Sequence, residues 1–291
     1  MRSRLALALL LLPAARAADP PSRYATLDGH KVHYRSVGSG SPAVVFIHGW
    51  TCDMTFWRLQ SDAIAAKHRV LLVDLPGHGQ SDKPPIDYTL ELFARAVDAV
   101  LRDAGVERAV LVGHSMGGPV GLKFLRLYPK KASGYVAVDA RFPVPPEDPA
   151  AIEKAKAQFA AFAALYRKPD YRATMEKMVD AMFAPITSTA VREEIRSKMT
   201  ATPQHVLASA MESMSEVLTW KPDPIDVPAL AILANNPGLR PETEQYARRI
   251  FPRLDYRPWD GVGHFLMMEK PEEFNRALLD FLAGISKASA R

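Results

Sequence analysis

The sequence predicts an α/β protein with a mostly parallel, doubly wound sheet and an inserted helical cap. Two observations lead to this prediction. Short, continuously apolar runs alternate with helical stretches along most of the chain, which is typical of right-handed strand–helix–strand units whose strands are buried on both faces. One long stretch, residues 141–220, has no strand pattern and interrupts the alternation.

The first expected elements are two strands of a hairpin at a sheet edge, because alternating residues flank the turn Asp28-Gly29. Continuous apolar runs then predict buried strands at residues 43–47, 70–73, 109–112, 135–138 and 229–233, followed by a strand-like run at 254–259. Helical patterns lie between them at residues 56–67, 90–104, 115–128 and 242–250, and a last helix is expected at 271–283.

The domain organisation follows from the interruption. Residues 141–220 carry only helical patterns, punctuated by Pro169, Pro185 and Pro203. We therefore expect a helical cap at 141–220, inserted into an α/β core that comprises residues 18–140 and 221–291.

The amino terminus has the pattern of a secretory signal peptide, residues 1–17. Arg2 and Arg4 precede an apolar run at 5–12, and a small-residue triplet ends at Ala17. The apolar run is shorter than the roughly 20 residues that a membrane helix needs. We expect export to the periplasm or the medium, without stable membrane insertion.

Composition narrows the function classes. The 291 residues are 48% hydrophobic and 24% charged, which excludes disordered and fibrous proteins. The net charge is +5, but basic and acidic residues are interspersed, so we expect no nucleic-acid partner. The single cysteine, Cys52, is expected to be a small buried side chain. The sequence makes no prediction about the oligomeric state.

The motif G-x-S-x-G at residues 113–117 points to a nucleophilic serine. An apolar strand precedes Ser115 and a helical pattern follows it. A serine on such a sharp turn is presented at the carboxyl edge of the sheet, beside a helix amino terminus that favours negative charge. The tight turn leaves no room for side chains two residues away on either side, which explains the glycines.

A serine hydroxyl needs a base, and histidine is the usual one near neutral pH. Among eight histidines, His264 is predicted, because it lies on a glycine-flanked loop between the last strand pattern and the last helix. His30 and His33 on the hairpin are expected at the surface, since no third metal ligand accompanies them. His48 and His78 are expected to fold loops.

Four motifs resemble those of the α/β-hydrolase superfamily, in that family's order: HGW at 48–50, DLPGHGQSD at 74–82, GHSMGG at 113–118 and GVGHF at 261–265. The resemblance covers nearly all of the chain after the signal segment and is to capped serine esterases. It implies that Ser115 is the nucleophile and His264 the base. It also implies an oxyanion hole formed by the backbone N–H groups of Trp50 and Met116.

The nucleophile separates this chain from similar enzymes. Haloalkane dehalogenases and epoxide hydrolases resemble it in the placement of the cap, but they carry Asp where this chain has Ser115. A carboxylate attacks carbon to give an alkyl ester, whereas a serine suits acyl transfer. We therefore expect a small-molecule ester, thioester, lactone or activated amide as substrate, and no halide or epoxide.

A serine–histidine pair also needs an acid that holds the histidine, which completes a catalytic triad, and the usual position of this acid carries no carboxylate here. In many family members it follows the strand after the cap, but here that strand is followed by Asn235 and Asn236, and Pro237 stands at the acid position. An amide orients a histidine without stabilising the imidazolium; an Asp-to-Asn change in a serine protease lowers turnover by about 10⁴. The two amides are expected to hydrogen-bond near the histidine.

We predict Asp139 as the acid. It ends the apolar run 135–138, one strand beyond that of Ser115, so its carboxylate should emerge at the same sheet edge. This position resembles that of a subset of haloalkane dehalogenases. The alternatives are that Asp139 only caps its strand or anchors the cap, and that Asp223 or Asp226, at the exit of the cap, is the acid.

The sequence also predicts residues of the substrate pocket and the absence of a cofactor. Phe56, Trp57 and Phe142 lie on loops and are predicted to line the substrate pocket. No metal-ligand cluster or nucleotide loop is visible in the sequence, so we expect no metal and no cofactor. The expected function is an exported serine hydrolase of carboxylic esters; hydrolysis of a lactone, amide or carbon–carbon bond, or ligand binding without turnover, are the alternatives.

Overall fold

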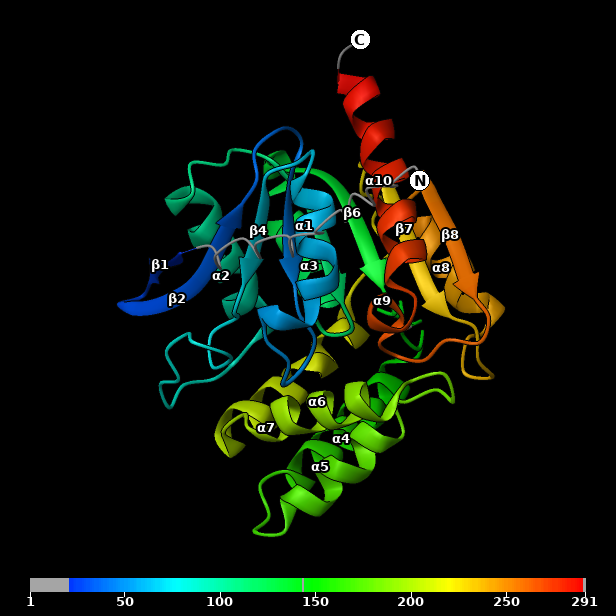
Figure 1. Ribbon diagram of the computed structural model, residues 1–291. Coiled ribbons are helices and arrows are strands. Elements are labelled where there is room, and N and C mark those ends of the chain that lie inside the picture. Colours follow the sequence, from blue (N-terminus) through cyan, green and yellow to red (C-terminus); the bar gives the residue numbers. More distant parts are fainter. Residues whose placement is uncertain (1–20, 143, 290–291) are drawn as a thin grey trace, which may run out of the picture.

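The computed structural model describes residues 21–142 and 144–289 of the chain. A twisted sheet with helices on both faces stands over a separate layer of helices, and the carboxyl ends of the parallel strands point toward that layer (Figure 1). The predicted signal segment, residues 1–17, lies outside the described residues.

The sheet has eight strands in the order β1-β2-β4-β3-β5-β6-β7-β8 within the described residues. β1 pairs antiparallel with β2, and β2 with β4, while all other neighbours are parallel. The strands are β1 Ser22–Leu27, β2 His30–Val37, β3 Ala43–Ile47, β4 Val70–Val73, β5 Ala109–His114, β6 Ala132–Val138, β7 Ala229–Ala234 and β8 Leu254–Trp259. The predicted mostly parallel α/β fold is confirmed.

The edge hairpin forms where it was expected. Asp28 and Gly29 between β1 and β2 have φ angles of +49° and +82°, as a two-residue turn between right-twisted strands requires. The central strands β3, β4, β5 and β7 are buried along their whole length. Their continuous apolar sequences are explained by helices that cover both faces.

The helices of the core form two layers. α1 Arg58–Ala65 and α10 Pro271–Ser289 pack together on one face, and α2 Leu90–Asp103 packs with α3 Gly117–Leu127 on the other (Figure 1). The remaining elements of the core are η1 Met54–Trp57, η2 Pro129–Lys131, α8 Pro241–Ile250 and α9 Leu266–Glu269.

The first and the last helix of the core begin or end differently from the prediction. The first helical stretch begins as the 3₁₀ turn η1, because the carboxylate of Asp53 accepts the N–H of Thr55 at 2.8 Å. The last helix continues to Ser289 instead of ending at residue 283, because Ile285 extends its buried face beyond Leu282.

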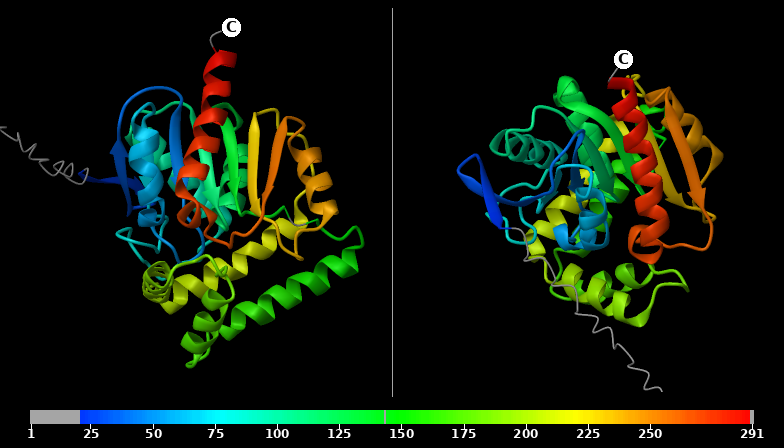
Figure 2. Two further views of the ribbon diagram at one scale, coloured as in Figure 1. Left: turned by 45° about the vertical axis from the view of Figure 1, so that its right-hand side comes forward. Right: turned by 45° about the horizontal axis from the view of Figure 1, so that its top comes forward.

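The cap is all-helical, as predicted. It comprises α4 Pro149–Leu165, α5 Tyr171–Asp180, α6 Thr189–Thr200, α7 Gln204–Ser213 and the 3₁₀ turn η3 Met214–Thr219, all between β6 and β7. Figure 2 shows it as a layer beneath the carboxyl ends of the strands. Polar contacts join it to the β3–α1 segment, including Arg58 with Glu194 at 2.6 Å and Lys198 with Asp53 at 3.4 Å. The cap therefore closes over the edge of the sheet where the serine motif ends.

None of the helices in the described part of the chain has the length and hydrophobicity needed to cross a membrane.

The loop after β4 is held by Asp74. Its Oδ1 accepts the N–H of Met54 at 2.8 Å, and its Oδ2 accepts the N–H of Gln80 at 2.9 Å and lies 2.7 Å from Nδ1 of His33. Burial opposes ionisation of this carboxyl, but the hydrogen bonds from His33 and the two N–H groups hold its pKa below its ordinary value. One buried carboxylate thus connects β2, η1 and the DLPGHGQS loop.

Replacing Asp74 by Asn should lower the free energy of unfolding by about 2–4 kcal/mol at pH 7, because an amide group replaces one of the two accepting oxygens. A carboxyl whose pKa is lowered by folding stabilises the protein above its ordinary pKa of 3.8 and loses that effect as the pH falls through the lowered value. In urea unfolding, the difference between wild type and Asp74→Asn should therefore be largest at neutral pH and shrink below pH 3.8.

Asp226→Asn is the matched control, since that carboxylate is 94% exposed and pairs only with Arg253. A difference for Asp74→Asn that stays constant from neutral to acid pH would show that the charge of Asp74 does not hold the loop.

Candidate active site

Ser115 lies on the turn between β5 and α3. Its φ of +50° is in the left-handed region, which a serine adopts only where the surrounding structure enforces it. Its N–H donates to the carbonyl of Val138 on β6 at 3.0 Å. A Cβ added to Gly113 would lie 2.2 Å from the carbonyl oxygen of Gly117, and one on Gly117 would lie 2.3 Å from that of Ile47. The glycines of the motif are therefore sterically required.

Asp139 occupies the corresponding position at the end of β6. It too has a positive φ, +40°, and its N–H donates to the carbonyl of Ile232 on β7 at 2.8 Å. Its Oδ1 accepts the N–H of Ala234 at 2.9 Å, and its Oδ2 lies 2.6 Å from Nδ1 of His264. The structure thus brings together the acid and the base that the sequence predicts.

His264 is held by its backbone as well as by its ring. Its N–H donates to the carbonyl of Met182 in the cap at 3.1 Å, and its own carbonyl accepts Nε2–H of His114 at 2.8 Å. Burial and the neighbouring charge of His264 lower the pKa of His114 to about 3, so His114 is neutral near pH 7. With its proton on Nε2, His114 orients the loop that carries His264.

The charge state of the pair follows from its surroundings. Burial opposes ionisation of the Asp139 carboxyl, but the hydrogen bond and charge of His264 and the N–H of Ala234 hold its pKa below the ordinary value. Asp139 is therefore a carboxylate at neutral pH and accepts Nδ1–H of His264. This tautomer leaves Nε2 of His264 free to take a proton.

Two backbone N–H groups flank the serine. Trp50 follows the turn after β3, and Met116 immediately precedes α3. The loop of Trp50 adjoins the nucleophile, because a Cβ on Gly49 would lie 3.1 Å from Cβ of Ser115. Within the described residues, neither N–H donates a hydrogen bond to another protein group. Both are available to an oxyanion, and the start of a helix favours negative charge there.

The side chain of Trp50 anchors its loop to the cap. Its indole Nε1–H donates to the carbonyl of Leu207 on α7 at 2.9 Å, and its ring meets the edge of Tyr166 with centroids 5.1 Å apart. On the other side of this loop, His48 bridges to the segment after β4, with Nε2 accepting the N–H of Leu75 at 3.0 Å. The loop that carries the predicted oxyanion donor is thus fixed from both the cap and the core.

A pocket of about 360 Å³ opens at these residues. Its polar lining consists of Ser115, Asp139, His264 and Arg141, and its apolar lining includes Phe159, Met214 and Val217 from the cap. Neither Arg141 nor these cap residues were predicted from the sequence to line the pocket. The position of Arg141 could have been predicted from the sequence, because Arg141 lies two residues beyond Asp139 at the same strand end. The positions of the cap residues could not, because they depend on how α4 and η3 pack.

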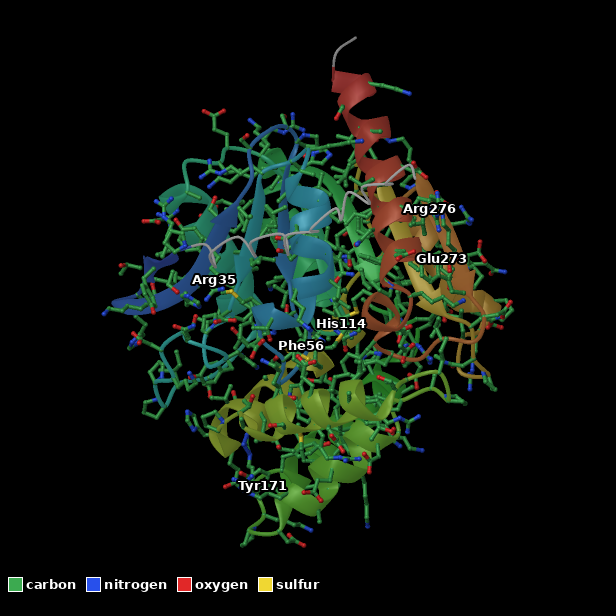
Figure 3. All side chains as sticks on the ribbon, in the orientation of Figure 1. Arg35, Phe56, His114, Tyr171, Glu273 and Arg276 are labelled. Carbon is green, nitrogen blue, oxygen red and sulfur yellow. The ribbon has the colours of Figure 1, made fainter. Side chains whose placement is uncertain are left out.

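Phe56, Trp57 and Phe142, which were predicted to line the substrate pocket, are not among the residues that line the pocket at Ser115. Phe56 and Trp57 are buried in the core. Although Phe56 lies near the junction of core and cap (Figure 3), its ring packs on Phe265 with centroids 5.8 Å apart, and Trp57 packs on Phe46 at 4.7 Å. Phe142 lines a smaller hollow, which shares Arg141 and Val217 with the pocket at Ser115. All three aromatic side chains, which follow strand ends, are buried.

The amides after β7 do not contact the histidine. Nδ2–H of Asn235 donates to Asp260 at 2.7 Å, and Oδ1 of Asn236 accepts from Arg141 at 2.7 Å. Their partners are Asp260, on the loop that leads to His264, and Arg141, which lines the same pocket as His264, so they do not hold the ring itself. The end of β7 still supports the acid, through the N–H of Ala234.

The alternative acids lie away from the base. Asp223 and Asp226 are exposed, and Asp226 pairs with Arg253 at 3.0 Å. His264 meets the carboxylate of Asp139 instead. The geometry thus favours Asp139, whose catalytic role remains a prediction.

A second Ser–His–Asp arrangement lies at the edge hairpin. His33, expected at the surface, is buried, with Nε2 2.8 Å from Oγ of Ser22 and Nδ1 2.7 Å from Asp74. Asp74 also accepts the N–H groups of Met54 and Gln80. These contacts assign the arrangement to holding the hairpin and the loop after β4.

Within residues 21–142 and 144–289, no group of three or more His, Cys, Asp or Glu side chains has the arrangement needed to hold a metal ion.

Comparison with known proteins places the chain among hydrolases. The model of the alpha/beta hydrolase family matches residues 44–277. A 2-hydroxy-6-oxononadienedioate/2-hydroxy-6-oxononatrienedioate hydrolase of Burkholderia vietnamiensis is 31% identical over 278 residues, which cover 87% of this chain and 91% of that one. A malate-bound structure of a thermophilic esterase from Thermogutta terrifontis has a TM-score of 0.77 and 26% identity, covering 91% of this chain and 99% of that one.

Other relatives are longer. Uncharacterised proteins of Mycobacterium bovis and Mycobacterium tuberculosis are 35% identical over 130 residues, which are 45% of this chain. The chain spans 38% of the length of these relatives.

The two Ser–His–Asp arrangements can be told apart by covalent labelling. A fluorophosphonate should modify Ser115 and leave Ser22 unmodified, because within the described residues the pocket and the two free N–H groups lie beside Ser115. Peptide mass spectrometry locates the label. Ser115→Ala should abolish labelling, and Ser22→Ala should leave its rate unchanged. A label on Ser22 would contradict this assignment.

Proposed function

Because the chain belongs to the alpha/beta hydrolase family, we propose that it is a serine hydrolase that cleaves small carboxylic esters through an acyl-enzyme. One observation carries the proposal: Ser115, His264 and Asp139 line a single pocket, with the carboxylate 2.6 Å from the ring of the histidine. A neutral hydroxyl nucleophile beside such a base suits acyl transfer.

The proposed reaction has two halves. Oγ of Ser115 attacks the ester carbonyl while Nε2 of His264 takes its proton, and Asp139 stabilises the imidazolium that results. The N–H groups of Trp50 and Met116 bind the oxyanion; one such donor is worth about 3 kcal/mol of barrier. His264 then protonates the leaving alcohol, and water, deprotonated by the same histidine, releases the acid.

The nature of the nucleophile supports esters over epoxides and halides. Opening of an epoxide or displacement of a halide at carbon uses a carboxylate, which forms an alkyl ester that water can hydrolyse. A serine in that role would form an ether, which water does not cleave under the same conditions. The likeness to the Thermogutta terrifontis esterase agrees with this choice.

A second candidate is hydrolysis of a carbon–carbon bond with the same triad. The observation that favours it is the 31% identity, over most of both chains, to the hydrolase of 2-hydroxy-6-oxononadienedioate. Lactone or amide hydrolysis, or ligand binding without turnover, are further alternatives.

Hydrolysis of p-nitrophenyl esters of increasing acyl length tests the proposal. Wild type should turn over short-chain esters, with a burst of p-nitrophenol where deacylation is slow. Ser115→Ala and His264→Ala should lower kcat by about 10⁵–10⁶, and Asp139→Asn by about 10⁴, because the imidazolium loses its counter-charge.

Asp226→Asn serves as control, since its carboxylate is exposed and pairs with Arg253; it should retain wild-type turnover. Absence of both burst and turnover on every short ester would reject the esterase proposal. An Asp139→Asn variant with nearly full activity would reject the assignment of the acid alone.

We also propose that the chain is exported. The basis is the sequence pattern of residues 1–17, with Arg2 and Arg4 before an apolar run and a small-residue triplet ending at Ala17. Expressed with its full amino terminus in a bacterial host, the protein should be recovered outside the cytoplasm with Ala18 as its first residue, as read by amino-terminal sequencing. A cytoplasmic protein that retains residues 1–17 would contradict the proposal.

A further inference from the structure

The active-site pocket contains a cation that the proposed reaction does not use. We infer that Arg141, held by Asn236, is a subsite for a carboxylate carried by the ester substrate. The inference rests on the proposed esterase function and narrows its substrate class to esters that bear an acidic group.

Arg141 is placed by the same strand end as the predicted acid. It lies two residues beyond Asp139, and it lines the pocket together with Ser115 and His264. Among the described residues that line this pocket, it has the only permanently charged cationic side chain. An anion bound by Arg141 would therefore share the pocket with an ester at Ser115.

The charge of Arg141 is not cancelled by a protein carboxylate. Its Nη2–H donates to Oδ1 of Asn236 at 2.7 Å, and in the described part of the chain no Asp or Glu forms an ion pair with it. Asp139, close in sequence, already uses both oxygens, one for the N–H of Ala234 and one for His264. The guanidinium is thus positioned by a neutral amide, and its positive charge is not paired with a carboxylate of the described residues.

The turn after β7 is shaped to hold this arrangement. The N–H of Gly238 donates to the same Oδ1 of Asn236 at 3.0 Å. A Cβ on Gly238 would lie 2.6 Å from Nη1 of Arg141, so the guanidinium lies directly against this glycine. A guanidinium has five N–H donors in a planar fork. With one donor used by the amide, others remain for two-point binding of a carboxylate.

The side chain of Asn236 is neutral, and this leaves the charge of Arg141 uncompensated. A carboxylate at this position would pair with Arg141 and compensate its charge, and the guanidinium would then attract an anionic substrate only weakly. Placing the acid of the triad on β6 leaves the end of β7 free to carry an amide. The carboxylate at the end of β6 therefore gives His264 a charged partner, and the amide at the end of β7 leaves Arg141 without one.

The test compares matched pairs of esters. In the first pair the carboxylate is on the acyl side: mono-p-nitrophenyl glutarate against its neutral methyl ester. In the second it is on the alcohol side: 4-(acetoxymethyl)benzoate against its methyl ester. The quantity measured is the ratio of kcat/KM for the anionic ester to that for the neutral one, at low ionic strength.

Wild type should favour the anionic ester in at least one pair, and this preference should fall as salt screens the guanidinium. Arg141→Gln should lower the ratio by about 10- to 100-fold, the range for charge-assisted hydrogen bonds. Asn236→Asp should lower it similarly, although Arg141 is still present, because the new carboxylate compensates its charge. A merely structural role of Arg141 would not give this second result.

Arg276→Gln is the matched control. It removes one positive charge from the exposed face of α10, away from the cap (Figure 3), and should leave the ratio unchanged. Turnover of the neutral ester reports folding in every variant. A ratio that neither Arg141→Gln nor Asn236→Asp changes in either pair overturns the inference alone, whereas a wild type that hydrolyses no neutral ester overturns the proposed function.

Discussion

The hydrogen bond between Nδ1 of His264 and Oδ2 of Asp139, 2.6 Å long, is the interaction on which the arrangement of the site depends. It joins a strand end to a loop 125 residues later in the chain. It forms only because β5, β6 and β7 are adjacent and parallel, so that Ser115, Asp139 and Ala234 all reach the same edge of the sheet. The lowered pKa of Asp139 is its electrostatic consequence.

The cap contributes to the site as well as covering it. It accepts the N–H of His264 through Met182 and the indole N–H of Trp50 through Leu207. One of these contacts is at the predicted base, and the other is at the loop of the predicted oxyanion donor. Any displacement of the cap therefore acts on both groups, which ties the shape of the pocket to the geometry around the nucleophile.

The features that the sequence predicted correctly are those set by local physics. Doubly buried strands need continuous apolar runs, and the turn at Ser115 needs glycines whatever packs around it. Asp139 could be placed because a strand end fixes the direction of its side chain. The pocket could not be predicted, since Phe159 and Met214 reach it through packing between the cap and the core. For the same reason Phe56 was misplaced: the sequence does not show that Phe265 would be there to receive its ring.

Because Asp139 lies at the end of β6, the cap is inserted after both Ser115 and Asp139 along the chain. These two residues lie on one short, continuous segment, strand–helix–strand. Were the acid at the end of β7, the whole cap would separate it from the nucleophile along the chain. Here the proposed nucleophile and the proposed acid form a unit that is complete before the cap begins. Insertions, deletions or exchange of cap helices can thus diversify the pocket without altering the spacing between those two residues, and only the loop of His264 has to adapt.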